Sequence, residues 1–312
     1  MRPRAVVAGG AGFLGYHFVQ HLLAEDFDVV MVDNLATGTR RNADDCVIPD
    51  RCDFIRQDVT EEVSVPGPVD YVINLACPAS PVDFSRIPIE IMRTCSLGTQ
   101  NLLELALHKG AEFLQASTSE IYGDPEVHPQ REDYTGNVNL IGPRAVYDEG
   151  KRYAEAMCFA YHRKYRLPVH VARIFNTYGP RMRSDDGRVV SNFCMQALTG
   201  EPLTIYGGGT QTRSFCYCTD EIEGLCRLMR SEHTGPINIG NPTETSIREF
   251  AELVIELTGS KSELRDVPLL HDDDPKRRRP DITRAKELLG WEPKTDLRTG
   301  LGRTLEWFRA MA

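Results

Sequence analysis

Two side chains four residues apart are placed to carry out acid–base chemistry on a hydroxyl group. Tyr147 and Lys151 open the segment YDEGKRYAEAMCFAYHRKY, whose pattern predicts a long helix over residues 147–165. Residues four apart share one face of a helix, so the phenol and the ammonium should point into the same space. Because an adjacent cation lowers the pKa of a phenol from about 10, Tyr147 could act as a general base near neutral pH.

A hydroxyl that could serve as the third member of this set lies earlier in the chain. Thr118 belongs to the run Ser117-Thr118-Ser119-Glu120, which directly follows a predicted strand at residues 113–116. Its hydroxyl could hold the substrate oxygen on which Tyr147 acts, with Ser119 and Glu120 beside it in the cleft. A turn-forming Ser/Thr cluster is the alternative for this run taken alone.

A glycine-rich turn near the N-terminus predicts a dinucleotide site. Gly9-x-x-Gly12-x-x-Gly15 follows a predicted strand at residues 4–8 and opens a helix, where a pyrophosphate can approach the backbone closely. Asp33 ends the second predicted strand and could accept hydrogen bonds from an adenosine ribose, which favours NAD over NADP. A glycine-rich turn without a ligand is the alternative. Further cofactor contacts are expected at Phe13, Leu14, Asn34, Thr37, Gly38, Asp58, Val59, Leu75 and Ala76, beside Tyr147 and Lys151.

The elements that must position these groups alternate between strands and helices. Strands are predicted at 4–8, 28–32, 54–57, 71–75, 113–116 and 169–175, and helices from about Gly12 and at 89–108 and 147–165. This alternation predicts an α/β fold with a Rossmann-type, doubly wound parallel sheet. Residues 1–177 should form the NAD-binding domain. Its ligands should lie beyond the carboxyl ends of the strands.

After residue 178, glycine and proline punctuate shorter elements. Helices are predicted at 189–198, 220–229, 247–257 and 297–311, which indicates a smaller mixed α/β lobe over 178–312 that binds the substrate. A segment at about 212–232 is expected to return to the first domain. No composition shift marks a linker, so the two parts should share one cleft.

Composition argues against a nucleic-acid-binding, membrane-spanning or metal-binding protein. The chain has 312 residues, 36 basic and 45 acidic, for a net charge of −9, which argues against nucleic-acid or anionic-membrane partners. No run approaches the roughly 20 apolar residues of a membrane span. The nine cysteines are odd in number and lack paired Cys-x-x-Cys spacing, so we expect free thiols, no metal and a cytoplasmic location.

The order of these motifs resembles that of the extended short-chain dehydrogenases, which include sugar-nucleotide epimerases, dehydratases and decarboxylases. The likeness covers nearly the whole chain and is most specific for UDP-glucuronate decarboxylases. It is carried by the strings ASTSEIYGDPEVHPQ, GPRAVYDEGKRYAE, ARIFNTYGPRM, DDGRVVSNF, GEPLTIYGGGTQTRSF and KRRRPDI.

The resemblance implies a closed catalytic cycle on UDP-glucuronate. Tyr147 would remove the proton of the sugar 4-hydroxyl while C4 reduces NAD, the resulting β-keto acid would lose carbon dioxide, and the returned hydride would give UDP-xylose. Glu120 and Arg278 would handle the carboxylate and the proton. Substrate contacts are implied at Ser119, Asn176, Arg188, Val190, Tyr206, Arg213 and Arg278, with Arg213 on phosphate. A homodimer through the helices beginning near Ile89 and Tyr147 is implied as well.

Four residues depart from the family pattern. Ala8 and Tyr16 flank the glycine turn where a Thr and a small residue are usual, and Cys95 replaces an Asn that supports the catalytic region. Cys77, in ACPASP, replaces a small residue and is expected to be an inert packing thiol.

Three other functions stay open from the sequence. A UDP-glucuronate 4-epimerase would share Tyr147, Lys151, Thr118 and NAD but suppress loss of carbon dioxide, and Glu120 with Arg278 favours decarboxylation over it. A 4,6-dehydratase would require an Asp-Glu pair after the Thr, where this chain has Ser119-Glu120. A cofactor-binding regulator without chemistry is the third, and the intact set of reactive groups argues against it.

Overall fold

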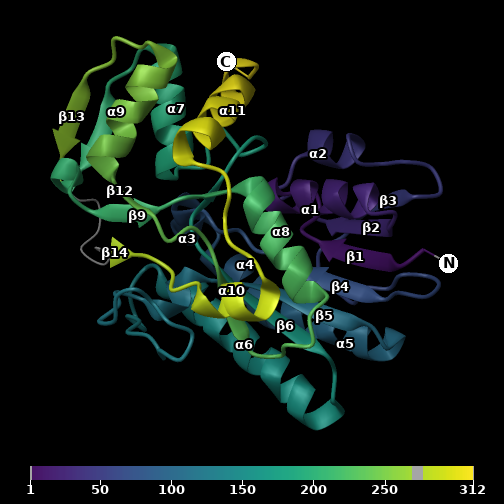
Figure 1. The fold of residues 1–312 in the computed structure, drawn as a ribbon. Helices are drawn as coiled ribbons and strands as arrows, with labels where there is room; N and C mark the ends of the chain where they lie inside the picture. The colour runs from purple at the N-terminus through teal and green to yellow at the C-terminus, as the bar shows by residue number, and fades with distance from the viewer. Residues whose placement is uncertain (1, 269–276, 312) are drawn as a thin grey trace.

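Parallel strands form the central sheet of the protein (Figure 1). In the computed structural model, which describes residues 2–268 and 277–311, seven strands follow the order β11-β6-β5-β4-β1-β2-β3, every neighbouring pair parallel. The strands are β1 (Arg4–Ala8), β2 (Asp28–Asp33), β3 (Cys52–Arg56), β4 (Tyr71–Asn74), β5 (Glu112–Thr118), β6 (Val169–Ile174) and β11 (Pro236–Ile239). The predicted Rossmann-type sheet is confirmed.

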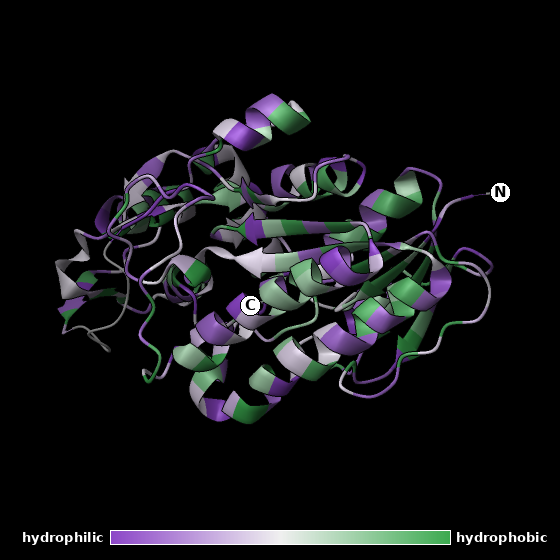
Figure 2. Cartoon of the chain, turned by 90° about the horizontal axis from the view of Figure 1, so that it is seen from below, coloured by the Kyte–Doolittle hydropathy of each residue, from purple (hydrophilic) through white to green (hydrophobic). Residues whose placement is uncertain are grey.

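Helices cover both faces of this sheet. One face carries α1 (Phe13–Ala24), α8 (Cys218–Met229) and α10 (Thr283–Leu289), and the other carries α4 (Pro88–Arg93), α5 (Thr99–Lys109) and α6 (Ala145–Tyr165). Successive residues of β1 serve the two faces in turn, since Ala5 and Val7 join the α1/α8 core and Val6 and Ala8 join the α5/α6 core. In Figure 2 the hydrophobic strands lie between helices whose outer sides are hydrophilic.

The helix predicted at 89–108 contains a π-turn. Pro88–Arg93 and Thr99–Lys109 are joined by η1 (Thr94–Gly98), which is wound with wider hydrogen-bonded turns. Thr94 Oγ1 and Ser96 Oγ donate to the carbonyl oxygens of Glu90 and Met92, so side chains compete for the helical acceptors at this point. Periodicity cannot distinguish such a turn from a regular helix. The short helices α2 (Arg40–Asp44) and α3 (Pro81–Arg86) were not predicted either.

A smaller lobe lies at the carboxyl-terminal edge of the sheet (Figure 1, upper left). Its elements are α7 (Val189–Thr199), β8 (Leu203–Tyr206), β9 (Thr212–Ser214), β12 (Glu244–Ser246), α9 (Ile247–Thr258), β13 (Leu264–Val267), β14 (Arg277–Arg278) and α11 (Leu297–Arg309). Stacked rings of Phe193, Phe215 and Phe250 fill its core. No helix among the described residues is both long and apolar enough to cross a membrane.

The chain crosses between the two parts more than once. Strands β7 (Thr177–Tyr178) and β10 (Cys216–Tyr217) pair beside the sheet, α8 then packs against the sheet, and β11 joins it as an edge strand next to β6. The sequence placed the returning segment at about 212–232, whereas the sheet also takes in β11 beyond it. The division into an NAD-binding and a substrate-binding domain remains a prediction.

A buried ion pair fixes the long helix α6 against the sheet. Glu155 accepts hydrogen bonds from Arg173 Nε at 3.1 Å and Nη2 at 2.9 Å, and from the Ser117 hydroxyl. Arg173 also donates to the Tyr122 hydroxyl at 2.9 Å. Glu155 lies one turn beyond Lys151 on the same face of α6, so this network sets the rotation of the helix that carries Lys151.

We predict that Glu155→Gln destabilises the protein strongly, because it leaves the buried Arg173 guanidinium without its counter-ion. The free energy of unfolding should fall by about 3–5 kcal/mol, measured by urea denaturation. Asp44→Asn, which removes the exposed partner of Arg40, is the control and should cost less than about 1 kcal/mol. Equal losses in the two variants would contradict the structural role given to Glu155.

Candidate active site

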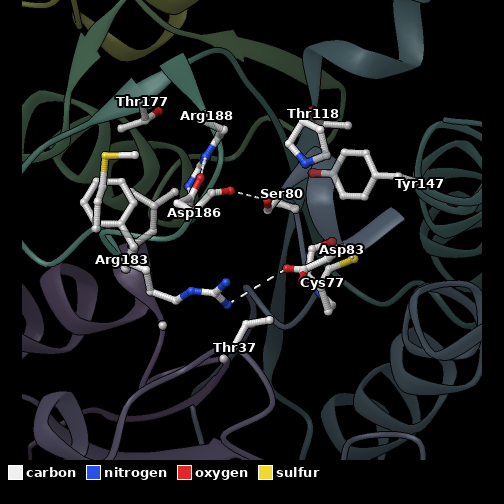
Figure 3. A pocket seen from close by; sticks show the side chains of 18 of the residues that line it. Thr37, Cys77, Ser80, Asp83, Thr118, Tyr147, Thr177, Arg183, Asp186 and Arg188 are labelled. Atoms are coloured by element: carbon white, nitrogen blue, oxygen red, sulfur yellow. Dashed lines mark hydrogen bonds and ion pairs between the residues drawn. The ribbon is translucent and has the colours of Figure 1, made fainter. Parts of the chain in front are cut away.

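A cavity of about 660 Å³ lies between the carboxyl ends of the central strands and the smaller lobe. Figure 3 shows side chains from both sides pointing into it. The structure brings almost every predicted site residue to its walls: Gly9, Gly12, Phe13, Leu14, Gly15, Asp33, Asn34, Thr37, Asp58, Val59, Leu75, Ala76, Thr118, Ser119, Glu120, Tyr147, Lys151, Asn176, Arg188, Val190, Tyr206, Arg213 and Arg278. Gly38 does not line it, but a Cβ there would lie 2.8 Å from an Asp33 carboxylate oxygen. The individual roles of these residues remain predictions.

The glycine turn between β1 and α1 is too tight for side chains. Gly9 has a φ of 78°, and a Cβ on Gly15 would lie 2.0 Å from the Gly9 carbonyl oxygen. The first turn of α1 therefore reaches the cavity with exposed backbone, which suits an anionic group. Tyr16 does not block the turn: its ring packs 4.1 Å from the Arg181 guanidinium, and its hydroxyl accepts a hydrogen bond from Arg181 at 3.1 Å.

Asp33 connects the glycine turn to the loop that follows β2. Its carboxylate accepts hydrogen bonds from the backbone N–H groups of Ala11 at 3.1 Å and Leu35 at 2.8 Å. Burial raises the pKa of Asp33, and these two hydrogen bonds oppose the rise. Each oxygen keeps acceptor capacity toward the cavity, so the site fits the ribose hydroxyls of a dinucleotide.

The catalytic set predicted from the sequence converges on one wall. Lys151 Nζ lies 5.7 Å from the centre of the Tyr147 ring and donates to the Ala116 carbonyl at 2.9 Å. Burial raises the pKa of Tyr147, while the Lys151 ammonium and a hydrogen bond with Thr118 act to lower it. The Lys151 ammonium acts to lower the pKa of this phenol as expected, but burial is the larger effect, so the pKa of Tyr147 stays raised.

A carboxylate held by two arginines lies on the same wall. Arg278 donates to both oxygens of Glu120, Nη1 to Oε1 at 2.6 Å and Nη2 to Oε2 at 2.8 Å, and Arg144 Nη2 donates to Oε2 at 2.7 Å. Although burial acts to raise it, Arg278 and Arg144 lower the pKa of Glu120 to about 2. Arg278 is buried, whereas its neighbour Arg277 is exposed.

Arg144 was missed by the sequence analysis. It precedes Tyr147 by three residues at the start of α6, so helical spacing could have indicated that the two side chains share a face. Its guanidinium lies 5.6 Å from the centre of the Phe84 ring, which in turn stacks on Tyr147 at 5.0 Å. Arg144 therefore touches both Glu120 and the aromatic wall of the base.

A loop of the smaller lobe closes the opposite side of the cavity. Arg188 pairs with Asp186 through Nη2 and Oδ2 at 2.8 Å, and the Ser80 hydroxyl donates to the Asp186 carbonyl across the cleft (Figure 3). Arg183 Nη1 lies 4.0 Å from an oxygen of Asp83. Of these residues only Arg188 was predicted, because an irregular loop carries no periodic signal.

A glycine turn after β1, a carboxylate ending β2 and a Tyr–Lys pair across the cavity define a Rossmann-fold enzyme that uses a dinucleotide to act on a hydroxyl-bearing carbon. The chain belongs to the NAD dependent epimerase/dehydratase family, whose profile matches residues 5–240. NAD is the cofactor of this family, in agreement with the prediction.

Similar proteins refine this placement. UDP-glucuronic acid decarboxylase 6 of Arabidopsis thaliana is 53% identical over 307 residues, covering 98% of this chain and 89% of that protein. UDP-glucuronic acid decarboxylase 1 of Danio rerio is 51% identical over 307 residues, covering 98% and 73%. A UDP-glucuronic acid 4-epimerase from Bacillus cereus, solved with UDP-glucuronic acid and NAD, has a TM-score of 0.88 at 28% identity, covering 99% and 100%. The resemblance recognised in the sequence is confirmed.

We predict that Gly15→Ala abolishes dinucleotide binding, because its Cβ would displace the Gly9 carbonyl. Isothermal titration with NAD should show at least about a 100-fold weaker affinity, equivalent to about 3 kcal/mol. Gly302→Ala, in α11 with nothing within 4 Å of the added carbon, is the matched control and should bind NAD normally. Unchanged affinity in Gly15→Ala would remove the glycine turn from the binding site.

Proposed function

We propose that this protein converts UDP-glucuronate into UDP-xylose and carbon dioxide, with NAD reduced and reoxidised within one cycle. The observation that carries the proposal is the Glu120 carboxylate clamped by Arg278 and Arg144 in the cavity that also holds Tyr147. The decarboxylases that are more than half identical to the chain support it.

Tyr147, Thr118 and Lys151 account for the oxidation step. The glycine turn and Asp33 would hold NAD, which would supply a reversible hydride acceptor for sugar C4. Tyr147 accepts the proton of the 4-hydroxyl, and Thr118 holds the oxygen from which that proton leaves. Lys151 keeps its ammonium beside the phenol through its bond to Ala116, which favours the ionised form of Tyr147.

The arginines around Glu120 account for the loss of the substrate carboxylate. Arg278, Arg144 and Arg213 act together on Glu120 and outnumber it in charge, so the cavity attracts anions although the whole chain carries −9. Arg278 can turn from Glu120 to the uronate carboxylate and stabilise the charge that develops as carbon dioxide leaves. With a pKa of about 2, Glu120 is ionised at neutral pH, so it can take up a proton, and then donate it, only after Arg278 has left it.

The 4-epimerase is the second candidate, because the Bacillus cereus 4-epimerase shares the fold at 28% identity. It would need the same base and cofactor but a carboxylate held where loss of carbon dioxide is disfavoured. NMR of the sugar nucleotide formed from UDP-glucuronate and NAD decides the matter. A pentose nucleotide supports decarboxylation, UDP-galacturonate the epimerase, and unchanged substrate the cofactor-binding regulator.

We predict that Tyr147→Phe keeps NAD affinity and loses turnover. Removing one general base should lower kcat by about 100- to 10,000-fold, since the ring and its packing on Phe84 are retained. Coupled measurement of carbon dioxide release checks the rate, and titration with NAD checks binding. A rate close to that of the unmodified protein would exclude Tyr147 as the base.

We predict that Arg144→Met shifts the pH dependence of catalysis. Loss of one guanidinium should raise the pKa of Glu120 above its value of about 2. On acidification, the activity that requires the ionised carboxylate should then be lost at a higher pH than in the unmodified protein. The acid limb of kcat/KM should move upward, with a fall of about 10- to 100-fold near neutral pH. Arg144→Lys, which keeps the charge, should restore the limb. An unmoved limb in Arg144→Met would limit Arg144 to packing.

We also propose a homodimer and a cytosolic location. Exposed apolar side chains gather on the helices predicted to pair, namely Ile89 and Met92 on α4, Leu97 on η1 and Tyr153 on α6. The nine cysteines are all free thiols, which suits a reducing compartment.

We predict that Met92→Glu yields monomers, because burying an unpaired carboxylate in the interface is costly. Light scattering after size exclusion should report half the mass of the unmodified protein. Leu288→Glu alters an equally exposed side chain on α10, across the sheet, and should leave the dimer intact. A monomeric unmodified protein, or a dimeric Met92→Glu variant, would contradict this interface.

A further inference from the structure

Two cysteines separated in the sequence meet beside the active site. Cys77 lies in the loop after β4, and Cys95 lies in the π-turn η1. Their sulfur atoms are 3.4 Å apart and share a hydrogen bond. All nine cysteines fall within the described residues, and Cys77 alone among them lines the cavity (Figure 3).

Cys95 is packed against the helix that carries the base. It is 2% exposed, and a Cβ on Gly150 of α6 would lie 3.1 Å from its sulfur. Gly150 stands between Tyr147 and Lys151 in the chain, and Cys95, Cys77 and Tyr147 belong to one apolar cluster. A movement of either sulfur would therefore displace the segment of α6 that carries Tyr147 and Lys151.

The surroundings favour a reactive pair. The hydrogen bond from Cys77 lowers the pKa of Cys95, and the Lys151 ammonium adds to that effect. The same hydrogen bond raises the pKa of Cys77. When the pair loses its first proton, the remaining proton therefore lies between the two sulfurs, on the Cys77 side. The Cys95 thiolate is therefore placed to act as a base that takes the proton of Cys77 and makes the Cys77 sulfur nucleophilic.

From this geometry we propose that Cys77 and Cys95 are an oxidation site for hydrogen peroxide, which converts them to a reversible disulfide that stops catalysis. Cys77 passes its proton to the Cys95 thiolate and its cavity-facing sulfur attacks the peroxide; the O–O bond breaks, and Cys77 becomes a sulfenic acid as hydroxide leaves and takes up a solvent proton to become water. The Cys95 thiol then displaces the sulfenic oxygen as a second water, forming the S–S bond. Two thiols lose two electrons and two protons, and the peroxide is reduced to two waters. This proposal departs from the inert packing role expected for Cys77 from the sequence.

Disulfide formation requires the two sulfur atoms to move. They must approach from 3.4 Å to about 2.05 Å, which changes the packing of Cys95 against Gly150. A displacement of about 1 Å at a catalytic group can cost about 100-fold in rate. We expect a loss of that size in turnover, a readout that rests on the proposed decarboxylase function.

The decisive experiment does not depend on any activity. The whole protein is treated with hydrogen peroxide, and its thiols are counted under denaturing conditions and mapped by mass spectrometry. We expect two of the nine thiols to disappear, a peptide linking Cys77 to Cys95, and recovery of both with dithiothreitol. The proposal is overturned if both thiols stay reduced after peroxide treatment, or if they are oxidised without forming a Cys77–Cys95 disulfide.

Single variants then test the order of events. In Cys95→Ala, dimedone should label Cys77 as a trapped sulfenic acid, whereas in Cys77→Ala, Cys95 should stay unlabelled because the cavity does not reach it. Cys194→Ala, in the buried core of the smaller lobe, is the control and should form the link as the unmodified protein does. Labelling of Cys95 in Cys77→Ala would overturn the assignment of Cys77 as the attacking sulfur.

Loss of turnover is followed in the same samples as the ratio of treated to untreated rate. A reversible loss that tracks the linked peptide supports the control of catalysis. A formed link with full turnover overturns that control while leaving the oxidation site in place, and absence of any turnover before treatment is a failure of the proposed function alone.

Discussion

The rotation of α6 is the constraint on which the site depends, and a buried ion pair sets it. Glu155 and Arg173 satisfy each other between the helix and the sheet, where an unpaired charge would be strongly unfavourable. Because Lys151 lies one turn before Glu155 and Tyr147 one turn before Lys151, a single anchored face aims both groups at the carboxyl ends of β5 and β6. Arg144 extends the same face to Glu120. One helix thus presents the Tyr147 phenol, the Lys151 ammonium and, at its N-terminal cap, the arginine that binds Glu120.

The local charge around Glu120 in the cavity is positive, whereas the net charge of the whole chain is negative. The chain is acidic, yet Arg278, Arg144 and Arg213 surround one carboxylate at the site. Such a local excess of positive charge allows an anionic sugar nucleotide to bind without giving the outer surface a general affinity for polyanions. The clamp also keeps Glu120 ionised at neutral pH.

Close packing makes the catalytic wall sensitive to events behind it. Phe84 stacks on Tyr147 and also lies beneath the Arg144 guanidinium, while Cys95 packs on Gly150 between the base and its cation. A densely packed interior transmits small displacements because it has little free volume to absorb them. The Cys77–Cys95 contact therefore lies where a change in one covalent bond reaches both reactive side chains.

Much of this architecture was predictable from local patterns in the sequence. The glycine turn, Asp33, Thr118 and the Tyr147–Lys151 pair were found because parallel strands bring their carboxyl ends to one edge, so spacing along the chain predicts proximity in space. The roles of Arg144 and Cys95 and the closing contact of Asp186 with Ser80 could not be predicted in this way. Each depends on a contact between segments far apart in the chain, or on an irregular turn whose hydrogen bonds leave no periodic trace. The sequence by itself determined which groups are available for chemistry and which fold carries them. Only the tertiary structure decided how burial and neighbouring charges set their ionisation, because those quantities depend on every segment that packs around a group.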